Sequence, residues 1–449
     1  MLRNLLPHFV TNCSKRVNFS KRVNFSTTMT SSPFTRAVVS SMRRLYPEAL
    51  ADKSFDNTGL LLEAPLLPSR RNRNSVLLTV DLTRAVADEA IENNHSVVVA
   101  YHPVIFRGLK SITLDDSQQQ SLLRLAANGI SVYSPHTAVD IVPDGMADWL
   151  CDVVTGSLGA PEPGEQSQSP PPSSETDVTT PLEPEMPPSA KPPTRRSADH
   201  DSTDDPFVSP TPKQKSKTSR PAVQHRTYSK PAYPRPTSSY YPASLPNTRT
   251  VVTSSPQSAI DAANQITSSQ TFNVNNTGAG RLIQFSTPQP LAFLITRIAH
   301  AIGLPKGFPV AIPQSASVED IRIKTVGVCP GSGSSVLRNC RPPPDLVFTG
   351  ELSHHEALAV IERGGCVVSL FHSNSERGYL WAVMREKLEK EVRREWQRVR
   401  TEAANGAEQR EDKLLQDEEV EVVVSKKDRD PFGIVVLNEA PVEGLNVGS

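Results

Sequence analysis

The chain has 449 residues, a length that suits two or three domains of ordinary size. Its 48 basic and 48 acidic side chains cancel, so bulk charge favours neither nucleic acid nor an acidic membrane surface. The five cysteines are scattered without a CxxC pair, which indicates neither a disulfide framework nor a cysteine zinc site and fits a reducing intracellular compartment. Since no apolar run approaches the roughly 20 residues of a membrane span, we expect a soluble protein.

Residues 1–30 are predicted to form a basic leader. The first acidic residue is Glu48, whereas Lys and Arg are spread among Ser, Thr and apolar residues before it. This composition is typical of a mitochondrial transit peptide. A disordered basic tail, or translation from Met29 or Met42, explains it as well. The expected location is therefore the mitochondrion or the cytoplasm.

Residues 31–160 are predicted to form an N-terminal α/β lobe. Apolar strand-like runs alternate with helix-like stretches, the pattern of a parallel sheet covered on both faces. The expected elements are a helix at 35–47, a strand at 75–83, a helix at 84–94, a strand at 96–106, a helix at 121–129 and a strand at 130–140. Asp81, His102 and Asp140 fall at or just after the carboxyl ends of these strands, where open parallel sheets form their ligand crevices.

Residues 161–271 are predicted to form a disordered insertion rich in Pro and Ser. Between Pro161 and Thr250 lie 20 of the chain's 40 prolines, with few apolar residues. Such a segment buries too little apolar surface to offset its ordering entropy. We favour a tolerated surface linker, and docking of protein partners through its proline runs is the alternative.

Residues 272–449 are predicted to form a C-terminal α/β lobe. Its expected elements are a helix at 291–305, a strand at 323–333, a helix from 334, a strand at 345–351, a helix at 354–365, a strand at 366–373, a long charged helix at 378–400 and strand-like segments at 419–437. The two lobes read as parts of one α/β architecture that the insertion interrupts.

Four residues are predicted to converge on a metal: His102, Asp140, His372 and Glu376. Each follows an apolar strand run, so all four can meet at one sheet edge. Taken singly, each also has a structural explanation, such as a cap or a turn. Imidazole and carboxylate ligands without thiolate suit zinc, iron, manganese or nickel in a catalytic site. Such an ion lowers the pKa of bound water to about 7 and supplies a hydroxide nucleophile.

Further groups lie near these candidates in the sequence. Glu351, His354 and His355 are expected to support the ligands or to act in acid–base chemistry. The glycine-rich CPGSG, Cys329–Gly333, follows a strand and precedes a helix, so it forms either an anion cradle or a tight turn. Cys329 is either a nucleophile or a small buried residue, and we favour the buried residue.

Eight stretches in this order resemble one family: FDNTGLLL, VDLT, YHPVIF, SPHTAVDIVPDGMADWL, GAGR, GELSHHEAL, FHSNSERGYL and SKKDRDP. They are similar to the Ngg-interacting-factor-three (NIF three-like) family, whose members are also called GTP cyclohydrolase 1 type 2 homologues or dinuclear metal centre proteins. The resemblance covers both lobes and excludes the leader and insertion. It implies two similar α/β lobes with mostly parallel sheets, a metal site in the cleft between them, and a hexameric ring built from dimers.

The resemblance also assigns residues. The family's metal ligands fall on His102, Asp140, His372 and Glu376, and His355 matches a histidine that lines the same cleft. Bacterial members have a histidine where this chain has Tyr101, a poorer ligand because its phenol pKa is about 10. The chain is therefore expected to bind one or two divalent metal ions.

The sequence is compatible with two functions. One is a metal-dependent hydrolase acting on a nucleotide or another small phosphorylated substrate, with His355 as proton shuttle. The other is a non-catalytic metal chaperone or a scaffold for protein partners, including transcription-related ones.

Overall fold

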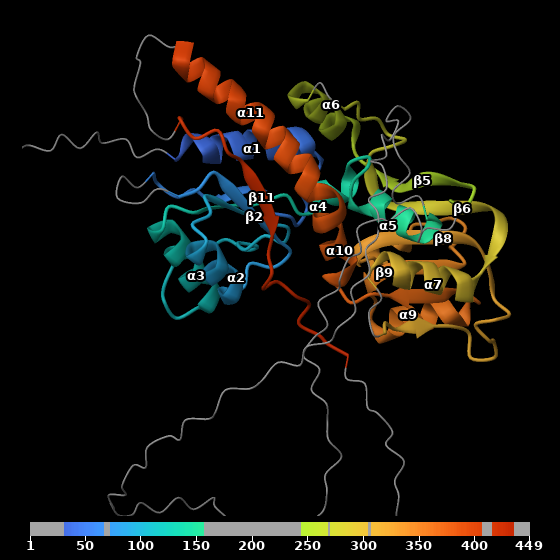
Figure 1. Ribbon diagram of the computed structural model, residues 1–449. Helices are drawn as coiled ribbons and strands as arrows, with labels where there is room; N and C mark the ends of the chain where they lie inside the picture. The colour runs from blue at the N-terminus through green and yellow to red at the C-terminus, as the bar shows by residue number, and fades with distance from the viewer. Residues whose placement is uncertain are drawn as a thin grey trace, which may run out of the picture. The chain divides into compact units, whose positions relative to one another are not determined.

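The structure is a computed structural model that describes residues 31–66, 72–156, 244–267, 270–303, 307–405 and 415–434 (Figure 1). The predicted leader lies outside the described residues, and so do residues 157–243, which make up most of the predicted insertion. The described chain forms two β-sheets with helices packed on them, so the predicted α/β class is confirmed. None of its helices is long and apolar enough to cross a bilayer.

The first sheet has the strand order β1–β4–β3–β2–β11. Its strands are β1 (Gly59–Leu62), β2 (Ser75–Thr79), β3 (Val97–Ala100), β4 (Ser131–Ser134) and β11 (Glu421–Val424). Strands β4, β3, β2 and β11 run parallel, and β1 pairs with β4 in the antiparallel sense. The prediction of a mostly parallel sheet is confirmed for this sheet.

Helices cover both faces of the first sheet, which explains why its strands are continuously apolar. They are α1 (Pro33–Leu45), α2 (Arg84–Glu92), α3 (Ser117–Ala127) and α11 (Arg385–Asn405). Adjacent strand residues point to opposite faces, so Leu77 packs in the cluster under α2 and α3, and Leu78 packs in the main core. On that second face α11 lies along α1 (Figure 1), where Trp396 meets Phe34 edge to face.

The second sheet has the strand order β5–β6–β8–β9–β10–β7. Its strands are β5 (Asn247–Ser254), β6 (Gly278–Pro290), β7 (Val310–Ala311), β8 (Arg322–Ser332), β9 (Leu346–Glu351) and β10 (Cys366–Ser369). Only β8, β9 and β10 run parallel, whereas β5, β6 and β7 pair in the antiparallel sense. The prediction of a mostly parallel sheet is therefore wrong for the second sheet.

The remaining helical elements are η1 (Glu48–Leu50), α4 (Thr137–Ile141), α5 (Met146–Thr155), α6 (Gln257–Ile266), α7 (Leu291–Ala301), α8 (Ser334–Leu337), α9 (His354–Glu362), α10 (Asn374–Tyr379) and the π-helical turn η2 (Leu380–Met384). Turn η2 joins α10 to α11 without a break.

The predicted C-terminal boundary of the insertion, residue 271, is wrong, because ordered structure begins earlier. Strand β5 and helix α6 both fall before residue 271, so ordered structure resumes by Asn247. Composition predicted disorder for this segment because it contains few large apolar side chains. Strand β5 alternates half-buried and exposed residues, as an edge strand does, and α6 buries only Ile260 and Ala263 among its own residues.

The two predicted lobes also exchange elements. Strand β11 comes from the predicted C-terminal lobe but pairs with β2 in the first sheet. Helix α5 belongs to the predicted N-terminal lobe yet packs on β6, β8 and α7 of the second. A division at the insertion alone therefore does not separate the two sheets.

Candidate metal centre

His102 stands two residues beyond the end of β3. Its amide donates to the carbonyl of Val80 at 3.0 Å, which extends the ladder between β2 and β3 by one step. Its ring Nδ1 lies 2.9 Å from Oδ1 of Asp81, the residue that follows Val80. Two neighbouring parallel strands thus supply a histidine and the carboxylate that orients it, at the edge where the sequence analysis placed both.

His372 lies between β10 and α10, and Glu376 lies at the start of α10. The chain turns sharply after β10 with Phe371 in the left-handed region at a φ of 68°, and Glu376 then lies in the first turn of α10. Glu376 is only 1 % exposed. The spacing of four residues brings both side chains together, as the sequence predicts.

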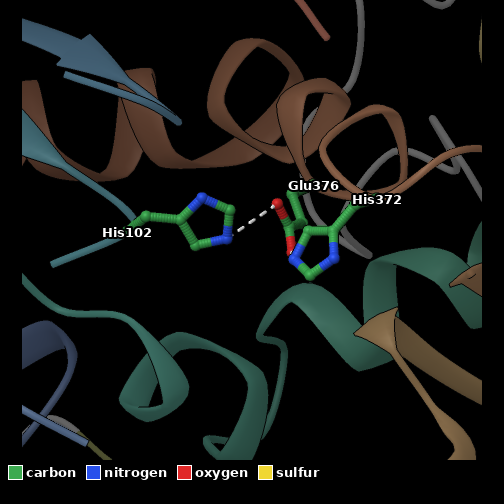
Figure 2. Close-up of side chains that lie close together, drawn as sticks. All are labelled: His102, His372 and Glu376. Carbon is green, nitrogen blue, oxygen red and sulfur yellow. Dashed lines mark ion pairs between the residues drawn. The ribbon is translucent and has the colours of Figure 1, made fainter. Parts of the chain in front are cut away.

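The three side chains meet at the Glu376 carboxylate (Figure 2). Nε2 of His102 lies 3.4 Å from Oε2, and Nε2 of His372 lies 3.4 Å from Oε1. One ligand atom from each residue falls within 4.8 Å of the others, a spacing suited to a shared metal ion. His102, His372 and Glu376 are therefore a group that could hold such an ion.

The outer nitrogen of each imidazole meets an acidic side chain. Nδ1 of His102 faces Asp81, and Nδ1 of His372 lies 2.9 Å from Oε1 of Glu351. Histidines that bind metals characteristically donate this second N–H to a carboxylate, because the bond fixes the tautomer and leaves Nε2 free as a ligand. Glu351, expected to support the ligands, meets His372 through this contact.

Two further observations fit a metal ion. Oε2 of Glu376 is buried, and among the described residues it meets Nε2 of His102 at 3.4 Å without a well-formed hydrogen bond, a costly condition for a carboxylate oxygen that a cation between the two would relieve. Gly331, with a φ of +57°, closes the site from β8. A Cβ at this position would lie 2.7 Å from Oε1 of Glu376 and 3.1 Å from Nε2 of His372. Only glycine leaves this space open.

The charges of the site act strongly on His102. Burial alone would lower its pKa, but Glu376 and Asp81 outweigh burial and raise the pKa of His102 to about 10. Burial works against ionisation of Asp81, yet the hydrogen bond and charge of His102 keep the pKa of Asp81 below its usual range. The carboxylates therefore favour a positive charge at this point, either the second proton of His102 or a cation that replaces it.

Asp140 lies in helix α4, because the predicted strand at 130–140 ends at Ser134 and the chain turns into a helix. The Tyr101 hydroxyl donates to its two oxygens at 2.8 and 2.9 Å. Desolvation raises the pKa of Asp140 well above its usual range; the Tyr101 hydrogen bond opposes this, and the charge of Glu376 adds to it. Asp140 does not belong to the close group of three, so its role as a ligand stays a prediction.

His136 was missed by the sequence analysis. It caps α4 with a φ of 36°, an uncommon backbone conformation for a residue other than glycine. Its Nδ1 lies 2.7 Å from Oδ1 of Asp56, and its ring lies 5.5 Å from that of His102. The available signal was its place in SPHTAVD, four residues before the candidate ligand Asp140.

Two aromatic rings flank His136 on the exposed side. Phe55 is 51 % exposed and Phe106 is 49 % exposed, and their centroids lie 6.3 and 6.4 Å from the His136 ring. A hydrogen bond from Asn57 to the carbonyl of Ile105 joins the two loops that carry them. The site thus has an apolar border beside its histidines.

His354 and His355 stand in the first turn of α9 and are exposed. Their rings contact each other at 5.2 Å. The role of His355 as proton shuttle stays a prediction. In the glycine-rich segment, the Gly331 amide donates to Oγ of Ser375 at 2.8 Å, which favours the structural turn over an anion cradle. Cys329 is buried, as expected.

Fold and site together define a two-sheet α/β protein with a candidate His–His–Glu metal site at the strand ends. The family model described as Duf34/NIF3 (NGG1p interacting factor 3) matches residues 34–405, and the chain belongs to this family. The resemblance noted in the sequence is thereby confirmed.

Relatives agree with this assignment, and a solved structure shares the fold. The chain is 36 % identical over 345 residues to the "Protein NIF3 homolog" of Schizosaccharomyces pombe, covering 77 % of this chain and 85 % of the relative. It is 29 % identical to the "NGG1-interacting factor 3" of Saccharomyces cerevisiae, covering 90 % and 99 %. A Bacillus cereus protein related to NIF3 has the same fold, with a TM-score of 0.50 and 18 % identity over 89 % of this chain and 98 % of that one.

Proposed function

We propose that this protein binds a divalent metal ion through His102, His372 and Glu376 and uses it to hydrolyse a nucleotide or another small phosphorylated substrate. The observation that carries the proposal is the buried Glu376 carboxylate. Both of its oxygens face an imidazole Nε2 at 3.4 Å, and one of them lacks a hydrogen-bond partner among the described residues. Zinc, iron, manganese and nickel all suit this donor set.

Each protein group has a definite task in this proposal. Asp81 and Glu351 hold the two imidazoles with Nε2 directed at Glu376. A bound divalent ion would supply Lewis acidity and a water whose pKa falls to about 7. His355 is the proposed group that moves a proton between substrate and solvent. Asp140 is a proposed further ligand, and the proposed number of ions is one or two.

A non-catalytic role as a metal chaperone or a protein-interaction scaffold is the alternative. It is supported by the name of the Saccharomyces cerevisiae relative, which describes a factor that interacts with another protein. Under this alternative the same three ligands hold the metal and no substrate is turned over.

The metal content of purified protein tests the ligand set. We expect wild-type protein to retain a divalent metal through desalting, and Glu376→Gln to lose most of it while still folding. Glutamine preserves the shape of the buried side chain but removes the charge that attracts the cation. Elemental analysis by mass spectrometry, with circular dichroism as a folding check, measures both.

A matched control is Glu362→Gln, which changes an exposed carboxylate near the end of the neighbouring helix α9. It should keep the wild-type metal content. Full metal content in Glu376→Gln would show that the ligand set is wrong. If wild type holds metal but hydrolyses none of a broad panel of nucleotides and sugar phosphates, the non-catalytic alternative is favoured.

The proposal extends to assembly and location. A homo-oligomer, hexameric by the family resemblance, and a mitochondrial or cytoplasmic location are both proposed. Light scattering of the purified protein and fractionation of cells that express the tagged chain test them.

A further inference from the structure

The metal centre is assembled from two separate parts of the fold. His102 and Asp81 follow β3 and β2 of the first sheet, whereas His372 and Glu376 follow β10 of the second sheet. A metal ion tolerates only small errors in ligand position, so something must fix the distance between the two pairs.

The segment that follows β11 reaches both pairs. After β11, the Ser425 amide donates to the carbonyl of Leu78 at 2.8 Å and so keeps the chain beside β2. The Ser425 hydroxyl then accepts from the amide of Asp428 at 3.1 Å. This local turn presents the Asp428 carboxylate to the interior, where its side chain is only 1 % exposed.

Asp428 bonds to the immediate neighbour of a site residue on each side. Its Oδ2 accepts from the Val80 amide at 2.8 Å, and Val80 directly precedes Asp81. The same Oδ2 accepts from Nε of Arg377 at 3.2 Å, and Oδ1 accepts from its Nη2 at 3.1 Å. Arg377 directly follows Glu376. The Asp428 carboxylate therefore links Val80, which precedes Asp81, to Arg377, which follows Glu376.

A second aspartate of the same segment strengthens this link. Oδ2 of Asp430 accepts from the amide and the hydroxyl of Ser373, at 3.1 and 2.8 Å. Ser373 directly follows His372. Asp428 and Asp430 are buried, whereas Lys426, Lys427 and Arg429 are exposed, so the motif SKKDRDP turns its acids inward.

The energetics point to positioning rather than to stability alone. Asp428 and Arg377 form a buried ion pair, with side chains 1 % and 5 % exposed. Such pairs often contribute no more stability than well-packed apolar residues, because desolvation offsets the attraction. What an apolar pair cannot reproduce is the directional bond to the Val80 amide.

We propose that Asp428 is a positioning residue of the metal centre, which sets the distance between His102 and Glu376 by bonding to Val80 and Arg377. This inference rests on the proposed metal function. It assigns a role in metal binding to a residue that touches none of the three ligands in the described contacts.

The test uses the full-length chain and Co²⁺, whose visible absorption reports ligand geometry. We expect Asp428→Asn to bind Co²⁺ between tenfold and 100-fold more weakly than wild type, the usual cost of losing a supporting contact. The absorption band of the bound Co²⁺ should also change, since the ligands no longer hold their spacing. Titration calorimetry gives the affinity.

Asp345→Asn is the matched control. Oδ2 of Asp345 also accepts two backbone amides, those of Lys324 and Thr325, but it lies before β9 begins, at the opposite strand end from Glu351. We expect this variant to lose thermal stability without any change in Co²⁺ affinity or spectrum.

A paired variant, Asp428→Leu with Arg377→Met, covers the case in which Asp428→Asn does not fold. It removes both buried charges, so it should fold and still bind Co²⁺ weakly. Wild-type affinity and spectrum in either folded variant would overturn the positioning role and leave the metal function intact. If the wild-type protein itself binds no Co²⁺, both proposals fail.

Discussion

Gly331 shows how one missing side chain shapes the site. Its backbone lies against Glu376 and His372, and its positive φ of +57° is one that most residues avoid. Glycine is therefore required here for two reasons: it accepts the positive φ of this turn in β8, and it leaves space beside Glu376 and His372.

Gly331→Ala should abolish most metal binding, because its Cβ would lie 2.7 Å from Oε1 of Glu376. The backbone strain adds a loss of about 1 kcal/mol in the free energy of unfolding. Metal analysis and urea denaturation measure the two effects separately.

Gly364→Ala separates strain from obstruction. Gly364 has a φ of +88°, but a Cβ there would meet nothing within 4 Å. This variant should show the same strain-related loss in the free energy of unfolding and keep the wild-type metal content. Equal metal loss in both variants would contradict the steric explanation.

At the scale of elements, the junction of α2 and β3 contains a buried histidine that is independent of the candidate metal centre. His95 is 3 % exposed, and its Nδ1 lies 2.8 Å from the hydroxyl of Ser75 at the start of β2. Burial lowers the pKa of His95 below its ordinary value of 6.5, although the nearby Glu421 opposes this. The folded chain therefore favours neutral His95.

This preference makes stability depend on pH. Below about pH 6.5 the unfolded chain takes up a proton that folded His95 resists, so the contribution present above that pH is lost as the pH falls. For one proton the slope is at most about 1.4 kcal/mol per pH unit. We expect His95→Gln to reduce the slope of the free energy of unfolding against pH between about pH 6.5 and 5, as measured by urea denaturation at each pH. An unchanged slope in His95→Gln would refute this account.

The elements also show what the sequence could predict. Strong apolar runs predicted β2, β3 and β9 and the histidines and carboxylates at their ends, because burial on two faces requires such runs. The helix α4 was mistaken for an extension of β4, since TAVDI is apolar enough for either state. His136 was missed because it lies in the turn before α4, and tertiary contacts define that turn.

At the scale of the whole molecule, exchanged elements join the two sheets. Helix α5 leaves the first sheet and packs against the second, where Arg281 of β6 holds it. Arg281 donates from Nε and Nη2 to the two oxygens of Asp148, each at 2.9 Å, and is 2 % exposed. Nothing in local sequence predicts such a pairing, because its partners lie on either side of the insertion.

Arg281→Met should lower the free energy of unfolding by about 3–5 kcal/mol, since it leaves Asp148 charged without its partner. Adding Asp148→Leu should recover much of this loss, because the unpaired charge is removed as well. Urea denaturation of both variants measures the difference. An equal loss in the double variant would contradict a charge-based cause.

The position of β11 has a consequence for biosynthesis. Strand β2 is made early, but its partner β11 follows far later, as the ion pair between Arg73 and Glu421 spans 348 residues. At roughly 5–20 residues per second, a ribosome needs between about 17 and 70 s to cover that interval. Throughout this time one edge of β2 lacks its final neighbour, and an open edge invites pairing with other chains. Newly made chains should therefore depend on chaperones until β11 leaves the ribosome, followed by the aspartates that contact both halves of the candidate metal centre.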